Sequence, residues 1–320
     1  MLFNSLDFAL FLPLVLLSYY ALPQRFRWVM LLVASYVFYM FWRWEYAGLL
    51  VLSTLTDYFV GLQLERTNDK RKRKWLLGLS LMINLGLLGF FKYQLFFVEN
   101  VNTLIGHVWA GHELWYWRVL LPVGISFYTF QTLSYTIAVY RRKQTAERHL
   151  GYFAVYVSYF PQLVAGPIER PQNLLPDLRK PHPVHNRDWA SGLRLMMWGF
   201  FKKLVVADNV SEVVDVVYAD PQAQTSWGVV VGGVLFCIQI YADFSGYSDI
   251  AIGTARLMGH RLMLNFSTPY FSSSLTAFWR RWHISLSSWF RDYVYIPLGG
   301  SRVGQLKLYR NLLITFVVSG

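Results

Sequence analysis

The residues best suited to chemistry lie together near the end of the chain, in the stretch from Trp279 to Gly300. This stretch contains a histidine, three arginines, an aspartate, several serines and three tryptophans, with a spacing typical of a helix. Such a helix would carry His283 at the border between an aromatic and a polar face. The aromatic face would hold Trp279, Trp282, Leu286, Trp289 and Tyr293, and the polar face Arg281, Ser285, Ser288 and Asp292.

The chemistry available to His283 is proton transfer. An unperturbed histidine titrates at about pH 6.5, and a low-dielectric environment keeps the imidazole neutral and able to accept a proton. His283 could instead orient a substrate or complete a buried hydrogen bond. The whole stretch could also be an amphipathic helix at the membrane interface, with Trp and Tyr at headgroup depth and Arg facing phosphates.

The composition indicates a polytopic membrane protein. Hydrophobic residues make up 55% of the 320 residues and charged residues only 15%, which excludes most soluble classes. The net charge of +12 comes largely from short loops between apolar runs, at 65–74, 141–149 and 169–190. This is the distribution of cytoplasmic loops under the positive-inside rule, so we do not expect nucleic-acid binding.

Apolar runs near 6–22, 28–42, 46–64, 75–98, 116–140 and 226–242 are long enough to cross, or nearly cross, a bilayer. With the N-terminus outside, the loop at 99–115 is outside and the basic loops alternate correctly up to residue 149. Pro161, Gly166 and Pro167 interrupt 150–168, so we expect a re-entrant segment there. Segment 189–219 carries several charges and either crosses among other helices, which we prefer, or lies along the cytoplasmic face.

Four further segments accompany the stretch around His283. They are Leu121 to Tyr128, Phe160 to Arg170, Tyr241 to Gly253, and the opening region from Phe8 to Tyr39. In this order the five segments resemble the membrane-bound O-acyltransferase (MBOAT) family, in its bacterial branch of alginate O-acetylation and teichoic-acid D-alanyl transfer proteins. The resemblance runs from the first residues to the last.

The resemblance implies an all-α polytopic membrane protein: a single multi-span helical bundle over residues 1–320 with re-entrant and interfacial helices. In the family, the Ser319-Gly320 pair is followed by an invariant histidine that acts as the main base. The chain ends within an apolar run just before that position. We therefore expect a fragment whose C-terminal part is missing and which is inactive alone, with His283 sharing the proton work of the complete protein.

The resemblance also implies the reaction. We expect an O-acyltransferase of the bacterial inner membrane that takes an acyl group, most simply acetyl, from a cytoplasmic thioester such as acetyl-CoA. The acceptor would be a polysaccharide such as alginate or another cell-surface glycan, reached through an external SGNH-type partner protein. The alternatives are D-alanyl transfer to teichoic acid, a polysaccharide or lipid transporter with His283 and Asp249 as a proton relay, and a non-catalytic scaffold.

Cationic residues on the expected cytoplasmic side could bind the phosphates of the donor. These are Arg170, Lys202, Lys203, Arg280 and Arg281. Contact with lipid headgroups, which we also expect as partners, is the competing interpretation.

The segment after the last long apolar run offers hydroxyls and carboxylates. They could form a polar wall of the reaction chamber, built from Asp243, Ser245, Tyr247 and Asp249. Alternatively, Asp243 or Ser245 caps a helix that begins there.

We expect neither a bound cofactor nor a metal ion. His182 and His185 have a spacing that a metal could use, but no carboxylate or cysteine in the sequence completes the set. The one cysteine, Cys237, lies in an apolar run and is expected to serve packing.

Overall fold

The computed structural model describes residues 1–108 and 120–319, and in these ranges the secondary structure is entirely helical. This confirms the expected all-α class. The helices are α1 (Leu6–Ala21), α2 (Gln24–Met40), η1 (Trp44–Tyr46), α3 (Ala47–Arg66), α4 (Lys70–Val108), α5 (Ile125–Tyr140), α6 (Leu150–Ser158), α7 (Phe160–Leu163), α8 (Pro171–Arg179), α9 (Asn186–Phe200), η2 (Phe201–Ala207), α10 (Asp208–Ala219), α11 (Ser226–Leu257), η3 (Pro269–Phe271), α12 (Leu275–Arg281), α13 (Ile284–Phe290), η4 (Arg291–Tyr295) and α14 (Gln305–Ser319).

Three helices of the described chain are long and apolar enough to cross a membrane: Trp44–Arg66, Lys70–Ile105 and Ser226–Leu257. Helix α4 continues to Val108, so the expectation that a loop begins at residue 99 is wrong. The rest of that loop, from 109 to 115, and the first residues of the span expected at 116–140 lie outside the described residues. Within the described residues, α5 begins at Ile125.

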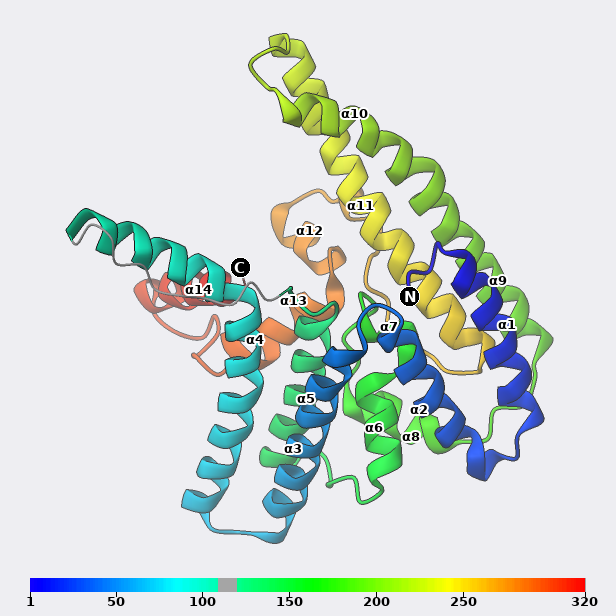
Figure 1. The fold of residues 1–320 in the computed structure, drawn as a ribbon. Helices are drawn as coiled ribbons and strands as arrows, with labels where there is room; N and C mark the ends of the chain where they lie inside the picture. Colours follow the sequence, from blue (N-terminus) through cyan, green and yellow to red (C-terminus); the bar gives the residue numbers. More distant parts are fainter. Residues whose placement is uncertain (109–119, 320) are drawn as a thin grey trace.

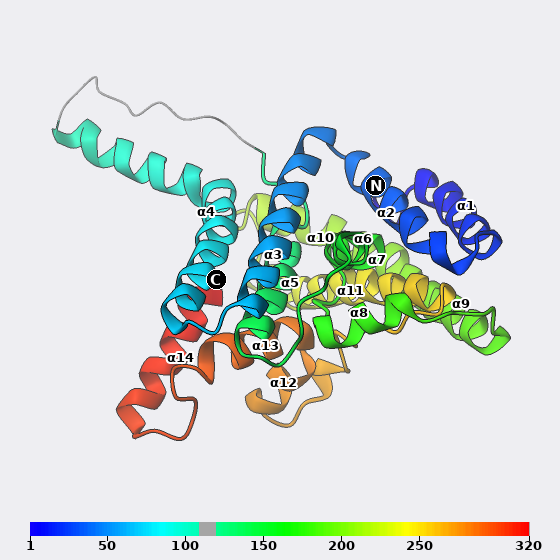
Figure 2. The same ribbon diagram turned by 90° about the horizontal axis from the view of Figure 1, so that it is seen from below.

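Helix α11 packs extensively against the helical segments that precede it in the chain. It runs beside α9, η2 and α10, which follow one another as a nearly continuous rod (Figure 1). Glycines permit the close approach, because a Cβ on Gly199 would lie 2.6 Å from the carbonyl oxygen of Gly246. In both views α4 and α14 lie on the side of the molecule opposite to α1 and α9 (Figures 1 and 2).

Both lysines of the expected crossing at 189–219 have protein partners. Lys202 and Lys203 lie in the π-helical turn η2, and their ammonium groups lie 2.7 Å from Asp249 and Asp243 of α11, respectively. A lipid-exposed lysine has no such partners. The packing therefore supplies, for these two lysines, the internal pairing that a membrane crossing requires.

The predicted interruption in 150–168 is present, at Tyr159. Helix α6 ends at Ser158, and α7 begins at Phe160. Pro161 does not cause the break, because it lies in the first turn of α7, where a missing N–H costs no hydrogen bond. Phe153, Tyr156, Tyr159 and Phe160 are completely buried, so the broken segment lies in the protein interior, where irregular backbone is tolerated. The re-entrant course through the membrane stays a prediction.

A buried carboxylate joins α3, α4 and α5. Asp57 has no exposed surface and accepts hydrogen bonds from the hydroxyl of Ser80, from Thr136 Oγ1 at 2.7 Å and from Asn84 Nδ2 at 2.7 Å. The amide oxygen of Asn84 in turn accepts a hydrogen bond from Ser53 at 2.6 Å. Three helices thus share one network in which the carboxylate has no unpaired oxygen.

We expect Asp57→Ala to destabilise the protein strongly. Each donor left without an acceptor costs about 1–3 kcal/mol, and the substitution removes the acceptor of Ser80 and Thr136 and one of the two acceptors of the Asn84 amide nitrogen. Thermal unfolding in detergent measures the loss, and Asp215→Ala is the matched control, because Asp215 is exposed on α10. A melting temperature as high as that of the wild type would contradict the role given to this network.

Candidate active site

The chain breaks at His283. Helix α12 is capped by Ser274, whose hydroxyl accepts from the backbone N–H of Ala277, and ends at Arg281. His283 adopts the left-handed conformation, with φ 41° and ψ 55°, and α13 starts at the next residue. The expectation of one continuous helix with a single aromatic face is therefore wrong. Trp289 is buried against Phe130, whereas Trp279 is 46% exposed.

Asn265 holds the broken chain from the preceding loop. Its side-chain oxygen lies 2.9 Å from His283 Nδ1 and also accepts from the hydroxyl of Ser285 at 3.0 Å. Its backbone oxygen accepts from the N–H of Ile284 at 2.8 Å. Its amide nitrogen donates to Ser248 of α11 at 3.1 Å. One buried asparagine thus joins α11, the loop and both sides of the break.

These contacts determine the tautomer of His283. The Asn265 oxygen that faces the imidazole already accepts hydrogen bonds from Ser285, so it is the carbonyl oxygen and Nδ1 must carry the proton. Nε2 then keeps its lone pair. The imidazole is consequently held as a base, with its basic nitrogen directed away from Asn265.

Three phenylalanines surround this imidazole. Phe244 of α11 meets it edge-on at 4.7 Å between ring centroids, and Phe127 and Phe266 stack at 6.3 and 6.1 Å. Burial in this apolar environment lowers the pKa of His283 to about 4. The side chain is therefore neutral across the physiological range.

The residues expected to form the chamber wall do not share one face of α11. Phe244 and Ser248 face His283, whereas Ser245 and Asp249 face Lys202. Asp243 pairs with Lys203. Tyr247 stacks on Phe3 at 4.4 Å, near the start of the chain.

The alternative assignment of Asp243 or Ser245 as a helix cap is wrong. Helix α11 continues through both residues without interruption. Its cap is Thr225, whose hydroxyl accepts from the N–H of Gly228 at 3.1 Å.

The expected donor-binding cations fall into two groups. Arg170, Lys202 and Lys203 are used internally: Arg170 pairs with Asp292 at 3.2 Å and lies over the ring of Tyr293, and the lysines pair with α11. Arg280 is exposed beside the break. Arg281 donates to the carbonyl oxygen of Phe271 at 3.1 Å. Of the five, only Arg280 and Arg281 lie next to His283 in the chain and have no carboxylate partner in the described structure.

One cluster in the described residues has side chains of the kind that hold a metal. Ligand atoms of Asp177, His182 and His260 lie within 4.8 Å of one another, so the structure brings a carboxylate to His182 that the sequence spacing did not indicate. His185 is not in this cluster; it precedes α9.

Hydrogen bonds already join the members of this cluster. His260 Nδ1 lies 3.3 Å from Asp177, and His182 Nε2 lies 2.8 Å from the carbonyl oxygen of Asp177. The guanidinium of Arg27 donates to the carbonyl oxygen of His182 at 2.9 Å. Its positive charge disfavours the binding of a metal ion at this cluster. The cluster is explained as a tie between α8 and the end of α11.

Asn265 and Ser248 were missed by the sequence-based reasoning, and so was the apolar enclosure by Phe127, Phe244 and Phe266. No local spacing connects Asn265 with a histidine 18 residues later. Ser248 lies within the Tyr241-to-Gly253 segment, but the polar wall was assigned to the neighbouring carboxylates and hydroxyls instead. A buried asparagine in a segment rich in Leu, Met and Phe was the signal available, because such an amide requires partners.

The fold and the site define an all-helical membrane protein with a half-buried histidine at a break between helices. A family model described as MBOAT, the membrane-bound O-acyltransferase family, matches residues 80–320. The chain belongs to this family, which confirms the resemblance seen in the sequence.

Three relatives illustrate the range of the similarity. A probable alginate O-acetylase of Azotobacter vinelandii is 43% identical over 100% of this chain and 64% of its own length. A peptidoglycan O-acetyltransferase of Helicobacter pylori is 36% identical over 100% of this chain and 66% of its own length. A teichoic acid D-alanyltransferase of Streptococcus thermophilus is 31% identical over 55% of this chain and 44% of its own length. The chain thus spans about 64% of the first of these relatives.

The low pKa of His283 predicts a specific pH dependence of stability. The unfolded chain takes up a proton at about pH 6.5, whereas the folded protein does so at about 4, so acid favours unfolding. Below pH 6.5 the free energy of unfolding should fall by at most about 1.4 kcal/mol per pH unit because of this group.

Melting temperatures of the wild type and of His283→Gln, followed in detergent between about pH 7.5 and 5, isolate this contribution. The wild type should lose more stability on acidification than the variant, because glutamine does not titrate. Parallel curves for the two proteins would show that His283 is not buried in its neutral form.

Proposed function

We propose that this protein is a membrane O-acyltransferase in which His283 takes part in proton transfer. The observation that carries the proposal is the neutral, half-buried imidazole held by Asn265, whose Nε2 lone pair has no partner among the described residues. Membership of the MBOAT family and the relatives named as O-acetylating enzymes support it. Because the chain spans about 64% of the first relative, the reaction is assigned to the full-length protein.

The proposed chemistry is attack of an acceptor hydroxyl on a thioester. The hydroxyl oxygen bonds to the acyl carbon, the carbon–sulfur bond breaks, and the hydroxyl proton passes by way of a base to the leaving thiolate. His283 acts beside the downstream histidine that the family resemblance implies as the main base, by accepting or orienting the hydroxyl proton. The apolar rings of Phe127, Phe244 and Phe266 limit the access of water, which would otherwise hydrolyse the thioester.

The donor we propose is cytoplasmic acetyl-CoA, with Arg280 and Arg281 contacting its phosphates. The acceptor is a cell-surface polysaccharide such as alginate, reached through an external SGNH-type partner. The protein would lie in the bacterial inner membrane with its N-terminus outside. Acetyl is favoured over D-alanyl, because the acetylating relatives align with the whole chain and the D-alanyltransferase with 55% of it.

Label transfer tests the enzyme against the transporter alternative. Membranes containing the full-length protein and its partner should incorporate radiolabel from acetyl-CoA covalently into the polysaccharide. Movement of polysaccharide across the membrane without covalent label would reject the acyltransferase and support a transporter.

Substitution of His283 separates proton transfer from positioning. His283→Ala should reduce turnover by about 10²- to 10⁴-fold, the usual contribution of a general acid or base, while membrane insertion stays the same. His283→Asn keeps a hydrogen-bonding side chain but cannot accept a proton, so it should be similarly impaired. Near-normal turnover of the asparagine variant would mean that His283 only orients the substrate.

Asn265 is the positioning residue in this scheme. Asn265→Ala frees the imidazole to rotate and change tautomer, and should reduce turnover by about 10- to 100-fold. Asn265→Asp keeps the acceptor for Nδ1 and raises the pKa of His283 through its charge, so the acid limb of the pH–rate profile should move upward. Asn209→Ala is the control, because the exposed amide of Asn209 bonds the backbone carbonyl oxygens of Leu204 and Val205 in its own helical segment. An unmoved profile in the aspartate variant would exclude this role.

Charge reversal tests the donor site. Arg280→Glu should raise the KM for acetyl-CoA roughly tenfold with little change in kcat, because contacts made equally in ground and transition states affect KM alone. Lys307→Glu, an equally exposed site on α14, controls for general charge effects. A loss confined to kcat would place Arg280 outside the donor site.

A further inference from the structure

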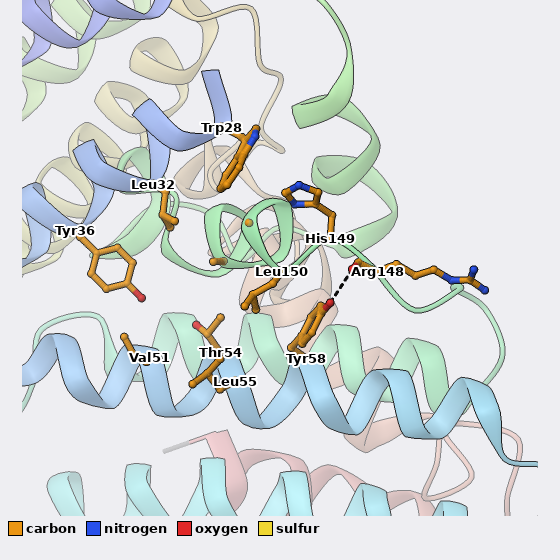
Figure 3. A pocket seen from close by; sticks show the side chains of 12 residues that line it. Trp28, Leu32, Tyr36, Val51, Thr54, Leu55, Tyr58, Arg148, His149 and Leu150 are labelled. Atoms are coloured by element: carbon orange, nitrogen blue, oxygen red, sulfur yellow. Dashed lines mark hydrogen bonds between the residues drawn. The ribbon is translucent and has the colours of Figure 1, made fainter. Parts of the chain in front are cut away.

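An open groove in the described part of the chain lies apart from His283, between α2, α3 and α6. It has a volume of about 650 Å³, within the range of about 300–1,000 Å³ found for ligand sites. Figure 3 shows Trp28, Leu32 and Tyr36 from α2 on one wall and side chains from α3 on the other. Helix α6 contacts both of these helices (Figure 1). Its residues Gly151 and Ala154 line the groove and present little or no side chain there.

The walls of this groove are apolar over most of its length. Leu32, Val51 and Leu55 line it, and the hydroxyl of Thr54 is bonded to the carbonyl oxygen of Leu50 in its own helix at 2.7 Å. Outside the groove both helices expose further apolar side chains, among them Val33, Leu52 and Phe59. The α3 wall belongs to a candidate membrane span, so the groove opens toward lipid.

One end of the groove is polar and cationic. Arg148 and His149, which precede α6, lie at this end, and the Arg148 side chain extends outward from it (Figure 3). The Arg148 side chain is 84% exposed, and its guanidinium comes no closer than 3.9 Å to the Glu65 carboxylate. This distance is at the limit of an ion pair. His149 Nδ1 accepts the N–H of Tyr152 at 3.3 Å, so in the neutral ring Nε2 carries the proton and can donate. Tyr58 bonds the carbonyl oxygen of Arg148 at 2.6 Å and holds the backbone in place.

The dimensions of the groove match one leaflet of a bilayer. From Trp28 to Tyr36 the α2 wall extends for roughly 12 Å at 1.5 Å per residue, and one leaflet of the hydrocarbon core is roughly 15 Å thick. We propose that an anionic phospholipid binds in this groove, with an acyl chain along α2 and α3 and its phosphate at Arg148 and His149. The charge of Arg148 selects for an anionic headgroup by roughly fivefold over a zwitterionic one.

Fluorescence quenching by brominated lipids tests this site. Cys237→Ser removes the single cysteine, and Val51→Cys then places a bimane label at the rim of the groove. In bilayers of phosphatidylcholine, brominated phosphatidylglycerol should quench this label with a relative association constant roughly fivefold higher than brominated phosphatidylcholine. Leu52→Cys is the matched control, because Leu52 is exposed on the same helix and does not line the groove. It should show no preference.

Two further variants decide the assignment. Arg148→Gln alters a largely exposed side chain and should abolish the preference at Val51, whereas Lys143→Gln, in the same basic loop, should leave it unchanged. Ala154→Leu fills the floor and should weaken quenching by both lipids at Val51 alone.

Three outcomes overturn the proposal. They are equal quenching by the two lipids at Val51, an undiminished preference in Arg148→Gln, and protection of Val51 from both lipids, which would mean that a protein segment occupies the groove. If Ala154→Leu does not assemble, the arginine variant still decides the question.

Discussion

A polar side chain buried among apolar helices must find its partner inside the protein, and this constraint governs how the helices meet. Water and lipid cannot replace a missing hydrogen bond in such an interior. Asp57 joins α3, α4 and α5 for this reason, Lys202 joins η2 to α11, and Asn265 joins α11 to the break at His283. The apolar surfaces allow many packings of these helices, whereas each polar pairing permits one register.

The strained backbone at His283 follows from the same constraint. A non-glycine residue in the left-handed region costs about 1–3 kcal/mol, so it persists only where surrounding contacts hold it. Asn265 provides them on both sides, since its side chain accepts from the imidazole and its backbone oxygen accepts from Ile284. Ser267 and Arg281 add a further backbone bond at 3.0 Å. The break directs the imidazole toward the three phenylalanines. On a regular helix, the side chain at this position would instead lie along the helix surface.

The class of protein could be predicted from the composition and from the positions of the basic loops. Both features follow from the partitioning of whole apolar segments into lipid, which does not depend on the details of packing. His283 stood out as a titratable group among tryptophans. Its local structure was predicted wrongly, because helical spacing describes residues 279–293 well and the cause of the break lies 18 residues earlier, at Asn265. The prediction of a helix cap at Asp243 or Ser245 was wrong for a similar reason. Both side chains are paired with lysines of η2, and the local sequence pattern cannot distinguish such pairing from capping.

Helix α11 couples the two polar parts of the molecule. Residues 244 and 248 face the imidazole, and residues 245 and 249, about 100° further round the helix, face Lys202. Because a lysine or carboxylate left unpaired in the interior is strongly unfavourable, the ion pairs resist rotation of α11 about its axis. That resistance keeps Ser248 opposite Asn265 and Phe244 against the imidazole. The lysines that sequence reasoning assigned to the donor thus have a positional effect on the site: they set the orientation of the helix on which the tautomer of His283 depends.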